Sequence, residues 1–280
     1  MQKLHEKILL GLFVICLTFT GCKTKKDKQT QPEIAVANSY LKAVIEDICG
    51  NQQHILSLVP PGMCPGHFDI SPSQVNQLCN CKILFAFDFQ QNIEKAIPRI
   101  RDKGLKMFCI APPPGLCMPD TYLSIAKQVA AALSEEKPSQ RAYYESRLAE
   151  IENRMKNLSH EMLEQIEQSK LKNSNVIVSQ HQAEFAQWLG LNPVSVFSGR
   201  DTMTPTQINN NLQEANQNKV NFVIANKQEG TEFAEAFAEH LKTRLVVFSN
   251  FPDKKNLNTQ LPGFDALVYD NVNNLIEVSK

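Results

Sequence analysis

The sequence lacks an excess of charge of either sign, because 29 Lys and Arg residues balance 29 Asp and Glu residues among 280. Binding to nucleic-acid phosphates requires a local excess of Lys and Arg, so this balance argues against a nucleic-acid binder. Beyond the N-terminus the sequence also lacks any apolar run long enough to cross a bilayer. With 42% hydrophobic residues, the chain can still bury a large core in one or two domains.

The N-terminal segment has the pattern of an export signal. Lys3 and Lys7 precede an apolar run, Ile8 to Phe19, which is followed by Thr20-Gly21-Cys22. The run of about a dozen residues is shorter than the roughly 20 that a membrane-spanning helix needs. The segment resembles the lipobox of bacterial lipoproteins, in which Cys22 would be the lipidated first residue of the mature chain. A cleavable signal with an incidental cysteine is the alternative.

A polar stretch without apolar periodicity follows the signal and is typical of a flexible tether. We therefore predict a lipoprotein signal peptide at residues 1–21 and a tether at residues 22–33. The mature protein is then expected outside the cytoplasm, periplasmic or at the cell surface. It would be held to the cell membrane by the lipid on Cys22.

Strands and helices alternate along the rest of the chain. Each strand that we expect is a short, mainly apolar run. The expected strands are Ile34–Asn38, Ile55–Val59, Lys82–Phe87, Leu105–Ala111, Asn175–Ser179, Val194–Phe197, Val220–Ala225 and Leu245–Phe248. Between the strands we expect helices at Leu41–Ile48, Asn92–Lys103, Pro119–Ser134, Gln182–Leu189, Thr231–Lys242 and Asp265–Val278. Two more helices are expected to begin at the capping boxes of Ser71 and Thr204. This alternation predicts an α/β protein of two lobes, each a mostly parallel sheet flanked by helices.

One segment breaks the alternation. Ser139 to Lys170 contains neither Gly nor Pro, and a single apolar stripe runs along it from Leu148 to Ile166. Such a pattern predicts one helix of about 30 residues, or about 45 Å. A coiled-coil seam is the alternative, although fewer than four heptads are present. We favour a backbone helix at residues 139–171 that joins lobes at residues 34–138 and 172–280.

Two histidines lie where an open α/β sheet binds its ligands, which is beyond the carboxyl ends of the strands. His67 follows the strand that ends at Val59, and His181 follows the strand that ends at Ser179. Neutral imidazole is the commonest side-chain ligand of transition metals, although structural histidines are also common. One histidine from each lobe therefore predicts a metal site between the lobes.

Other polar and aromatic residues share this placement after strands. Glu229 is expected to supply a carboxylate to the metal. The ligand cleft is expected to be lined by Asp69, Phe89, Gln180, Asn226 and Asn250.

Two cysteines, Cys64 and Cys117, lie in the loops at the same edge of the first lobe. As thiolates they would bind zinc or another thiophilic metal. A disulfide between the two loops is the alternative that an oxidising compartment allows. Cys109, inside a strand, is expected to be a small buried apolar residue.

Several motifs together resemble the metal-binding lipoproteins of ABC transporters, the solute-binding proteins that capture zinc or manganese. They are Ala37-Asn38-Ser39-Tyr40-Leu41, Ser57-Leu58-Val59-Pro60-Pro61-Gly62, His67-Phe68-Asp69 before Ser71-Pro72-Ser73, Tyr143-Tyr144 in the long helix, and Val178-Ser179-Gln180-His181 through Leu189-Gly190-Leu191. The resemblance implies a monomer without enzymatic activity. Zinc or another divalent transition metal would be the transported ligand, and an ABC permease with its ATPase would be the partners.

The sequence departs from this family at two of the usual ligands. The second histidine, ahead of Pro119, is absent, and Cys117 lies in that stretch. The acidic residue expected after Phe248 is replaced by Ser249-Asn250-Phe251-Pro252. Two alternatives therefore stay open. One is a binder of a chelated metal, such as a siderophore or corrinoid, contacted through Phe68, Phe89 and Trp188. The other is a lipid-anchored metalloenzyme with Glu229 or Asp69 as general base.

Overall fold

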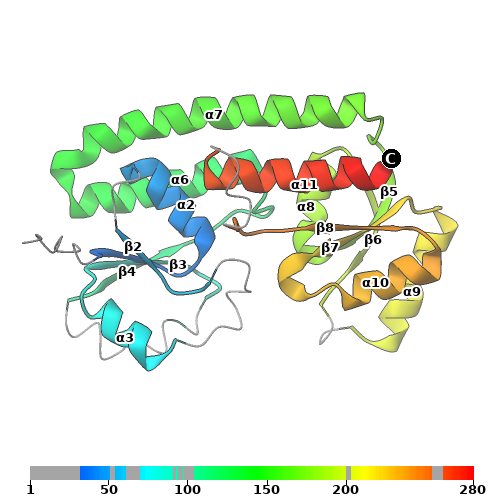
Figure 1. Ribbon diagram of the computed structural model, residues 1–280, viewed down its shortest axis with the longest axis horizontal. Coiled ribbons are helices and arrows are strands. Elements are labelled where there is room, and N and C mark those ends of the chain that lie inside the picture. Colours follow the sequence, from blue (N-terminus) through cyan, green and yellow to red (C-terminus); the bar gives the residue numbers. More distant parts are fainter. Residues whose placement is uncertain are drawn as a thin grey trace, which may run out of the picture. The chain divides into compact units, whose positions relative to one another are not determined.

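Two four-stranded parallel sheets form the framework of the protein in the computed structural model (Figure 1). The structure describes residues 32–50, 54–60, 70–90, 93, 97, 104–199, 203–253 and 261–280. The described residues from Pro32 to Lys280 belong to one compact unit. The predicted signal, Cys22 and most of the predicted tether lie outside the described residues, as do Cys64, His67 and Asp69.

The two sheets have the same strand order. Sheet A contains β1 (Ile34–Val36), β2 (Ile55–Ser57), β3 (Ile83–Phe87) and β4 (Lys106–Ile110) in the order β2-β1-β3-β4. Sheet B contains β5 (Asn175–Ser179), β6 (Asn192–Phe197), β7 (Phe222–Asn226) and β8 (Arg244–Phe248) in the order β6-β5-β7-β8. All neighbouring strands in both sheets are parallel. The predicted α/β class with two parallel sheets is confirmed.

Helices connect and cover the strands. The longer α-helices are α2 (Ser39–Cys49), α3 (Pro72–Leu78), α6 (Pro119–Glu136), α7 (Arg141–Gln168), α8 (Ala183–Trp188), α9 (Pro205–Gln217), α10 (Glu232–Leu241) and α11 (Gly263–Ser279). The helix starts expected at Ser71 and Thr204 are both complete capping boxes, with Gln74 and Gln207 at the third position. Within the described part of the chain, no helix is long and apolar enough to cross a membrane.

Helix α7 is the long helix expected from the sequence. It spans 28 residues, which is about 42 Å at about 1.5 Å per residue, and it follows the short 3-10 turn Pro138–Gln140. Its buried stripe includes Ile151, Met155 and Met162. It packs against α6, α2 and α11 (Figure 1). Helix α7 thereby links the lobe of sheet A to the lobe of sheet B.

The inner faces of the two sheets belong to one continuous hydrophobic core. Val36 and Phe85 of sheet A, and Val178 and Phe248 of sheet B, lie in a single cluster with the buried faces of α2, α6, α7 and α11. At its centre the ring of Phe264 stacks on Tyr122, with 4.1 Å between their centroids. The core of one lobe is therefore continuous with the core of the other.

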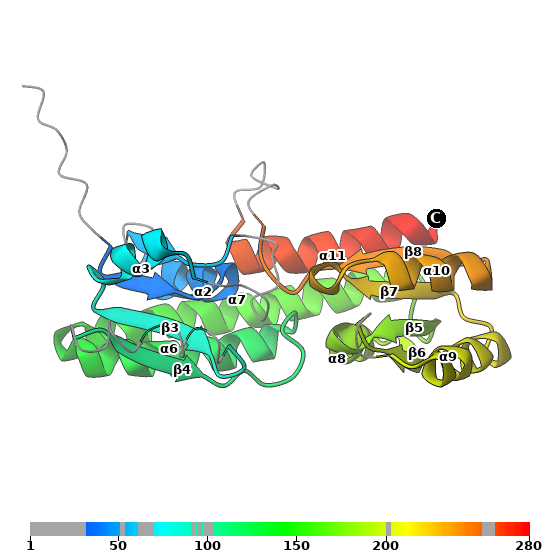
Figure 2. The same ribbon diagram turned by 90° about the horizontal axis from the view of Figure 1, so that it is seen from below.

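Each sheet also has a separate core on its outer face. For sheet A this cluster includes Leu78 of α3 and Leu84 of β3. For sheet B it includes Val223 of β7 and Phe237 of α10, and Figure 2 shows α9 and α10 on this side of the sheet. The strands are thus covered on both faces, as expected for parallel sheets.

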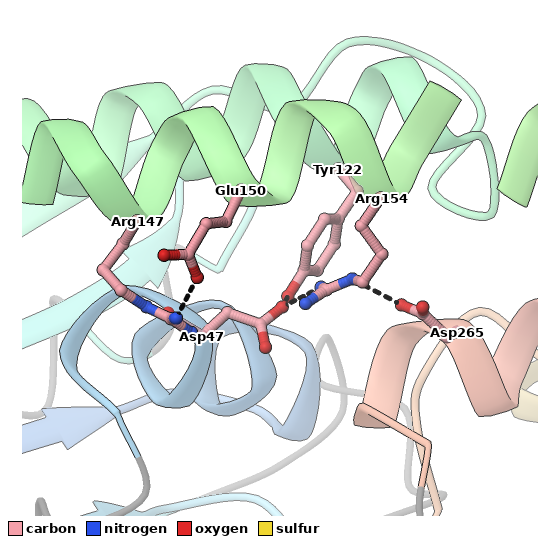
Figure 3. Close-up of polar contacts among 6 residues, drawn as sticks. All are labelled: Asp47, Tyr122, Arg147, Glu150, Arg154 and Asp265. Carbon is pink, nitrogen blue, oxygen red and sulfur yellow. Dashed lines mark hydrogen bonds and ion pairs between the residues drawn. The ribbon is translucent and has the colours of Figure 1, made fainter. Parts of the chain in front are cut away.

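A partly buried group of charged side chains lies within the shared helical layer (Figure 3). Arg154 of α7 forms ion pairs with Asp47 of α2 and with Asp265 of α11, the latter at 3.2 Å. Asp47 also accepts a hydrogen bond from the hydroxyl of Tyr122 in α6. Burial raises the pKa of the Asp265 carboxyl to about 6, while the Arg154 charge opposes that shift. We call Arg154, Asp47, Tyr122 and Asp265 the charged hub.

A few sequence predictions were wrong at particular residues. Asn38, expected in a strand, is the N-cap of α2, because its side-chain oxygen accepts a hydrogen bond from the Leu41 amide. Val220, also expected in a strand, instead closes the end of α9 through a bond to Ala215. Cys109 is exposed rather than buried, because β4 is an edge strand. Strand β6 begins before Pro193, which an edge strand tolerates.

Candidate functional site

A histidine and a carboxylate meet at the carboxyl end of sheet B. His181 lies in the 3-10 turn Gln180–Gln182 directly after β5, and Glu229 ends the 3-10 turn that follows β7. Their facing atoms, Nε2 of His181 and Oε1 of Glu229, are 3.2 Å apart. The other carboxylate oxygen accepts a hydrogen bond from the Ser179 hydroxyl. The His181 side chain is 62% exposed, so its ring remains accessible to a ligand.

A network of uncharged side chains lies beneath this pair, centred on Asn250. The Oδ1 atom of Asn250 accepts a hydrogen bond from Gln182 at 3.0 Å, and Gln182 also donates to Asn226 at 3.3 Å. The Nδ2 atom of Asn250 donates to the carbonyl of His181 at 3.3 Å. Asn250, Gln182 and Asn226 are all buried. Asn226 and Asn250, predicted to line the ligand cleft, therefore support the turn that carries His181.

Cys117 reaches this network from the other lobe. Its thiol donates a hydrogen bond to the carbonyl oxygen of Ser249 at 3.0 Å and lies 3.3 Å from Oδ1 of Asn250. The side chain of Asn271 in α11 donates to the Cys117 sulfur at 3.5 Å. Burial raises the pKa of this thiol far above its usual range, because a thiolate would be poorly solvated there. Cys117 is a free thiol here, and Cys64 lies outside the described residues.

The edge of sheet A contributes a buried amide pair. Asn38 donates to Oε1 of Gln90 at 3.0 Å, and the same oxygen accepts a bond from the Phe87 amide at 3.0 Å. Within the described ranges, the Nε2 atom of Gln90 is buried without a hydrogen-bond partner. Phe89 is 49% exposed and stacks on Phe87. Phe89 is thus an accessible apolar residue of this edge.

The two lobes approach each other closely beside Cys117. Gly115 has a φ of +77°, and a Cβ atom there would lie 3.2 Å from the Cβ of Glu184 in α8. The neighbouring carbonyl of Leu116 accepts a hydrogen bond from the Tyr40 hydroxyl at 2.9 Å. Glycine is therefore required at position 115 both for its backbone conformation and for the space between the lobes.

A cavity of about 650 Å³ lies between α2 and α11. Its walls include Ser39 and Ser57 from the edge of sheet A, and Lys227 and Phe251 from the edge of sheet B. Its volume lies within the range of about 300 to 1,000 Å³ that is typical of small-molecule sites. Ser249 lines this cavity, and its backbone carbonyl accepts the hydrogen bond from Cys117.

The structure brings together some of the residues predicted from the sequence. His181 contacts Glu229, Cys117 contacts Asn250, and Gln180 accepts a hydrogen bond from Ser198. His67, Cys64 and Asp69 lie outside the described residues. Among the residues that the structure describes, no group of three or more His, Cys, Asp and Glu side chains could hold a metal ion.

Sequence reasoning missed three residues of the network, namely Gln182, Gln228 and Asn271. Gln182 and Gln228 are adjacent to His181 and Glu229, so their position after a strand was the available signal. Asn271 lies in the middle of α11, where the side-chain pattern of a helix gives no indication of a partner in another lobe.

Comparison with known families gives one match. The family described as ZnuA, zinc-uptake complex component A, periplasmic, matches residues 117–278. No curated protein matches the sequence significantly.

Solved structures of similar fold cover nearly the whole described chain. A zinc-bound ZnuA deletion mutant has a TM-score of 0.69 at 17% identity, with 89% of this chain and 98% of that chain covered. The manganese-bound periplasmic metal-binding protein from Candidatus Liberibacter asiaticus has a TM-score of 0.73 at 13% identity, with 88% and 99% covered. The cadmium-bound form of that protein gives the same values. At such low identity, these similarities establish the fold.

Proposed function

The chain belongs to the family of zinc-uptake complex component A, and we propose that it is the extracytoplasmic substrate-binding lipoprotein of an ABC importer. Its cargo would be a transition-metal ion, zinc or manganese. It would deliver this ion to a permease and its ATPase without a chemical reaction. The observation that carries the proposal is the His181–Glu229 pair at the carboxyl ends of β5 and β7.

The chemistry of this pair supports metal capture. Imidazole nitrogen and carboxylate oxygen are common ligands of zinc and manganese in proteins. Nε2 of His181 faces Glu229, so its Nδ1 is the ring nitrogen turned away from that contact. We propose His67 and Cys64 as the ligands from the other lobe. For Cys117 the contacts with Ser249, Asn250 and Asn271 support a different role.

Metal analysis of the purified protein, with and without reductant, tests this proposal. We expect about one zinc or manganese ion per chain, and calorimetric titration of the metal-free protein should reproduce that ratio. The double variant His67→Ala with His181→Ala should lose the bound metal. His240→Ala, an exposed histidine on α10, is the matched control and should bind normally. Unchanged stoichiometry and affinity in the double variant would show that the ligand assignment is wrong.

The cavity between α2 and α11 favours one alternative cargo, a chelated metal such as a siderophore or corrinoid. Its volume suits a small organic ligand, and Phe89 offers an exposed ring at the edge of sheet A. A tight ligand stabilises the native state by mass action, so a thermal-shift screen distinguishes the two cargoes. Free-ion capture predicts stabilisation by the metal salts alone, whereas chelate capture predicts stabilisation only by the complexes.

The anchoring part of the proposal rests on the segment that ends at Cys22. Metabolic labelling with a fatty acid should mark the wild-type precursor in cells. The Cys22→Ser variant should carry no label and should leave the membrane fraction. Membrane association that persists unchanged in Cys22→Ser would contradict the lipid anchor.

A further inference from the structure

The turn that follows β8, Ser249–Phe251, is held by hydrogen bonds from several elements. Both backbone groups of Ser249 bond to the side chain of Asn271 in α11, at 2.9 Å each. The Ser249 hydroxyl accepts a bond from Gln228 at 2.9 Å, and the Asn250 amide donates to the same Gln228 side chain at 2.9 Å. This turn is therefore fixed to both α11 and the 3-10 turn that carries Glu229.

Asn250 connects this turn to both members of the His181–Glu229 pair. Its Nδ2 atom bonds to the carbonyl of His181, and its backbone amide bonds to Gln228, the residue before Glu229. A shift of Asn250 would therefore move His181 and Glu229 relative to each other. Asn250 itself is 5% exposed, so it supports the pair from below.

Cys117 is the residue of the lobe of sheet A that hydrogen-bonds to this turn, and the ring of Tyr40 also contacts Phe251. Cys117 lies at the end of the loop before α6, and its side chain is fully buried. Its S–H group points at the carbonyl of Ser249, and its sulfur has Asn250 and Asn271 as its other neighbours. A metal bound by this sulfur would have to replace these three contacts.

We propose that Cys117 is a positioning residue and not a metal ligand. As a protonated thiol it holds the Ser249–Phe251 turn, and through Asn250 it fixes the distance between His181 and Glu229. This inference deepens the proposed function, because it rests on that pair as the metal-binding half-site of sheet B. Without the Cys117 sulfur, this half-site offers nitrogen and oxygen donors, which zinc and manganese both accept and which suit a soft ion such as copper(I) less well.

Two substitutions of Cys117 separate the two roles. Cys117→Ser keeps a hydrogen-bond donor for the Ser249 carbonyl, whereas Cys117→Ala removes it. We expect the serine variant to bind zinc with nearly wild-type affinity. The alanine variant should lose about tenfold or more, as substitutions behind metal ligands commonly do. Cys109→Ser, on the exposed edge strand β4, is the matched control and should leave affinity unchanged.

Cobalt spectroscopy distinguishes a Cys117 that binds the metal from a Cys117 that only positions the turn. If Cys117 bound the metal, the cobalt(II)-loaded protein would show a thiolate-to-metal charge-transfer band that Cys117→Ser weakens or abolishes. We expect the spectrum of Cys117→Ser to match that of wild type. A band that weakens in this variant, but not in Cys109→Ser, would overturn the proposal.

The metal-free protein provides a readout that does not depend on the proposed function. The ring resonances of His181, followed by NMR, should shift in Cys117→Ala and in Asn250→Ala but stay in place in Cys117→Ser. If Cys117→Ala fails to fold, Asn250→Ala still tests whether the Ser249–Phe251 turn positions His181. Unshifted His181 resonances in both Asn250→Ala and a folded Cys117→Ala would refute the inference. Failure of the wild type to bind metal would refute only the proposed function.

Discussion

The edges of the two sheets are built alike but carry different chemistry. In sheet A the amide of Asn38, after β1, bonds to Gln90, after β3. In sheet B the amide of Gln182, after β5, bonds to Asn226 at the end of β7. Because β1 and β3 are neighbours, as are β5 and β7, each amide pair joins the ends of the two central strands.

Sheet B adds the His181–Glu229 pair to this common arrangement. His181 and Glu229 both lie in 3-10 turns, one after β5 and one after β7, whereas Asn38 begins the regular helix α2 directly. Buried amides therefore connect the strand ends in both sheets, while the 3-10 turns of sheet B carry the two residues that we propose as metal ligands. The shared core and the charged hub then join these two edges to one helical layer.

The largest expected effect comes from removing a side chain of the hydrophobic core that the two lobes share. Phe264 of α11 is fully buried against Tyr40 and Tyr122, which belong to the lobe of sheet A. We expect Phe264→Ala to lower the free energy of unfolding by about 3–5 kcal/mol, through lost burial and the cavity left behind.

Urea unfolding checks this prediction with two signals: the fluorescence of Trp188, the only tryptophan and a residue of sheet B's lobe, and the far-ultraviolet circular dichroism of the whole chain. In Phe264→Ala the two transitions should separate, because the contact between the lobes is weakened. Phe237→Ala, in the outer core of sheet B, should be destabilised while the transitions stay coincident. Coincident transitions in Phe264→Ala would contradict a stability shared through this residue.

The charged hub predicts a smaller, pH-dependent effect. The pKa of Asp265 is about 6 in the folded protein, against about 3.9 for an unfolded chain, so the native state binds this proton more tightly. The contribution of Asp265 to stability is therefore greatest below about pH 4, and it is lost as the pH rises to about 6. Asp265→Asn removes this dependence.

The comparison to measure is the unfolding free energy of Asp265→Asn minus that of wild type. It should increase by about 2–3 kcal/mol between pH 4 and pH 7 and then level off, since each pKa unit corresponds to about 1.4 kcal/mol. Glu184→Gln, on the exposed face of α8, is the control for loss of a surface carboxylate. A flat difference for Asp265→Asn would show that burial does not perturb this carboxyl.

The smallest effect compares the two amide pairs directly. Asn38→Ala loses both the N-cap of α2 and the bond to Gln90, so we expect a cost of about 2 kcal/mol. Gln182→Ala loses no helix cap, and a cost of about 1 kcal/mol is expected. Thermal unfolding of both variants measures the difference. A larger cost for Gln182→Ala than for Asn38→Ala would mean that the helix cap at Asn38 does not set the difference between the two edges.

The fold was predictable because its signals are local in the sequence. The apolar stripe of α7, the capping boxes at Ser71 and Thr204, and the short apolar runs of the strands each specify one element. Asn38 shows where such signals fail. It directly follows the apolar run of the expected strand, but its side chain caps the following helix and so ends the strand before it.

The candidate site was predictable in part, from the rule that ligands bind at the carboxyl ends of parallel strands. That rule placed His181 and Glu229 at the edge of sheet B, where they meet. The contact of Cys117 with Ser249 and Asn250 spans more than 130 positions in the sequence. This contact forms only when the two lobes pack together, so no spacing pattern in the sequence predicts it.

The shared core also governs when the chain can finish folding. The first buried helix, α2, packs against α11, and the ring of Tyr40 near the start of the described chain contacts Phe264 near its end. Contacts of such high sequence separation form slowly. During synthesis the lobe of sheet A stays incomplete until the C-terminal helix has left the ribosome.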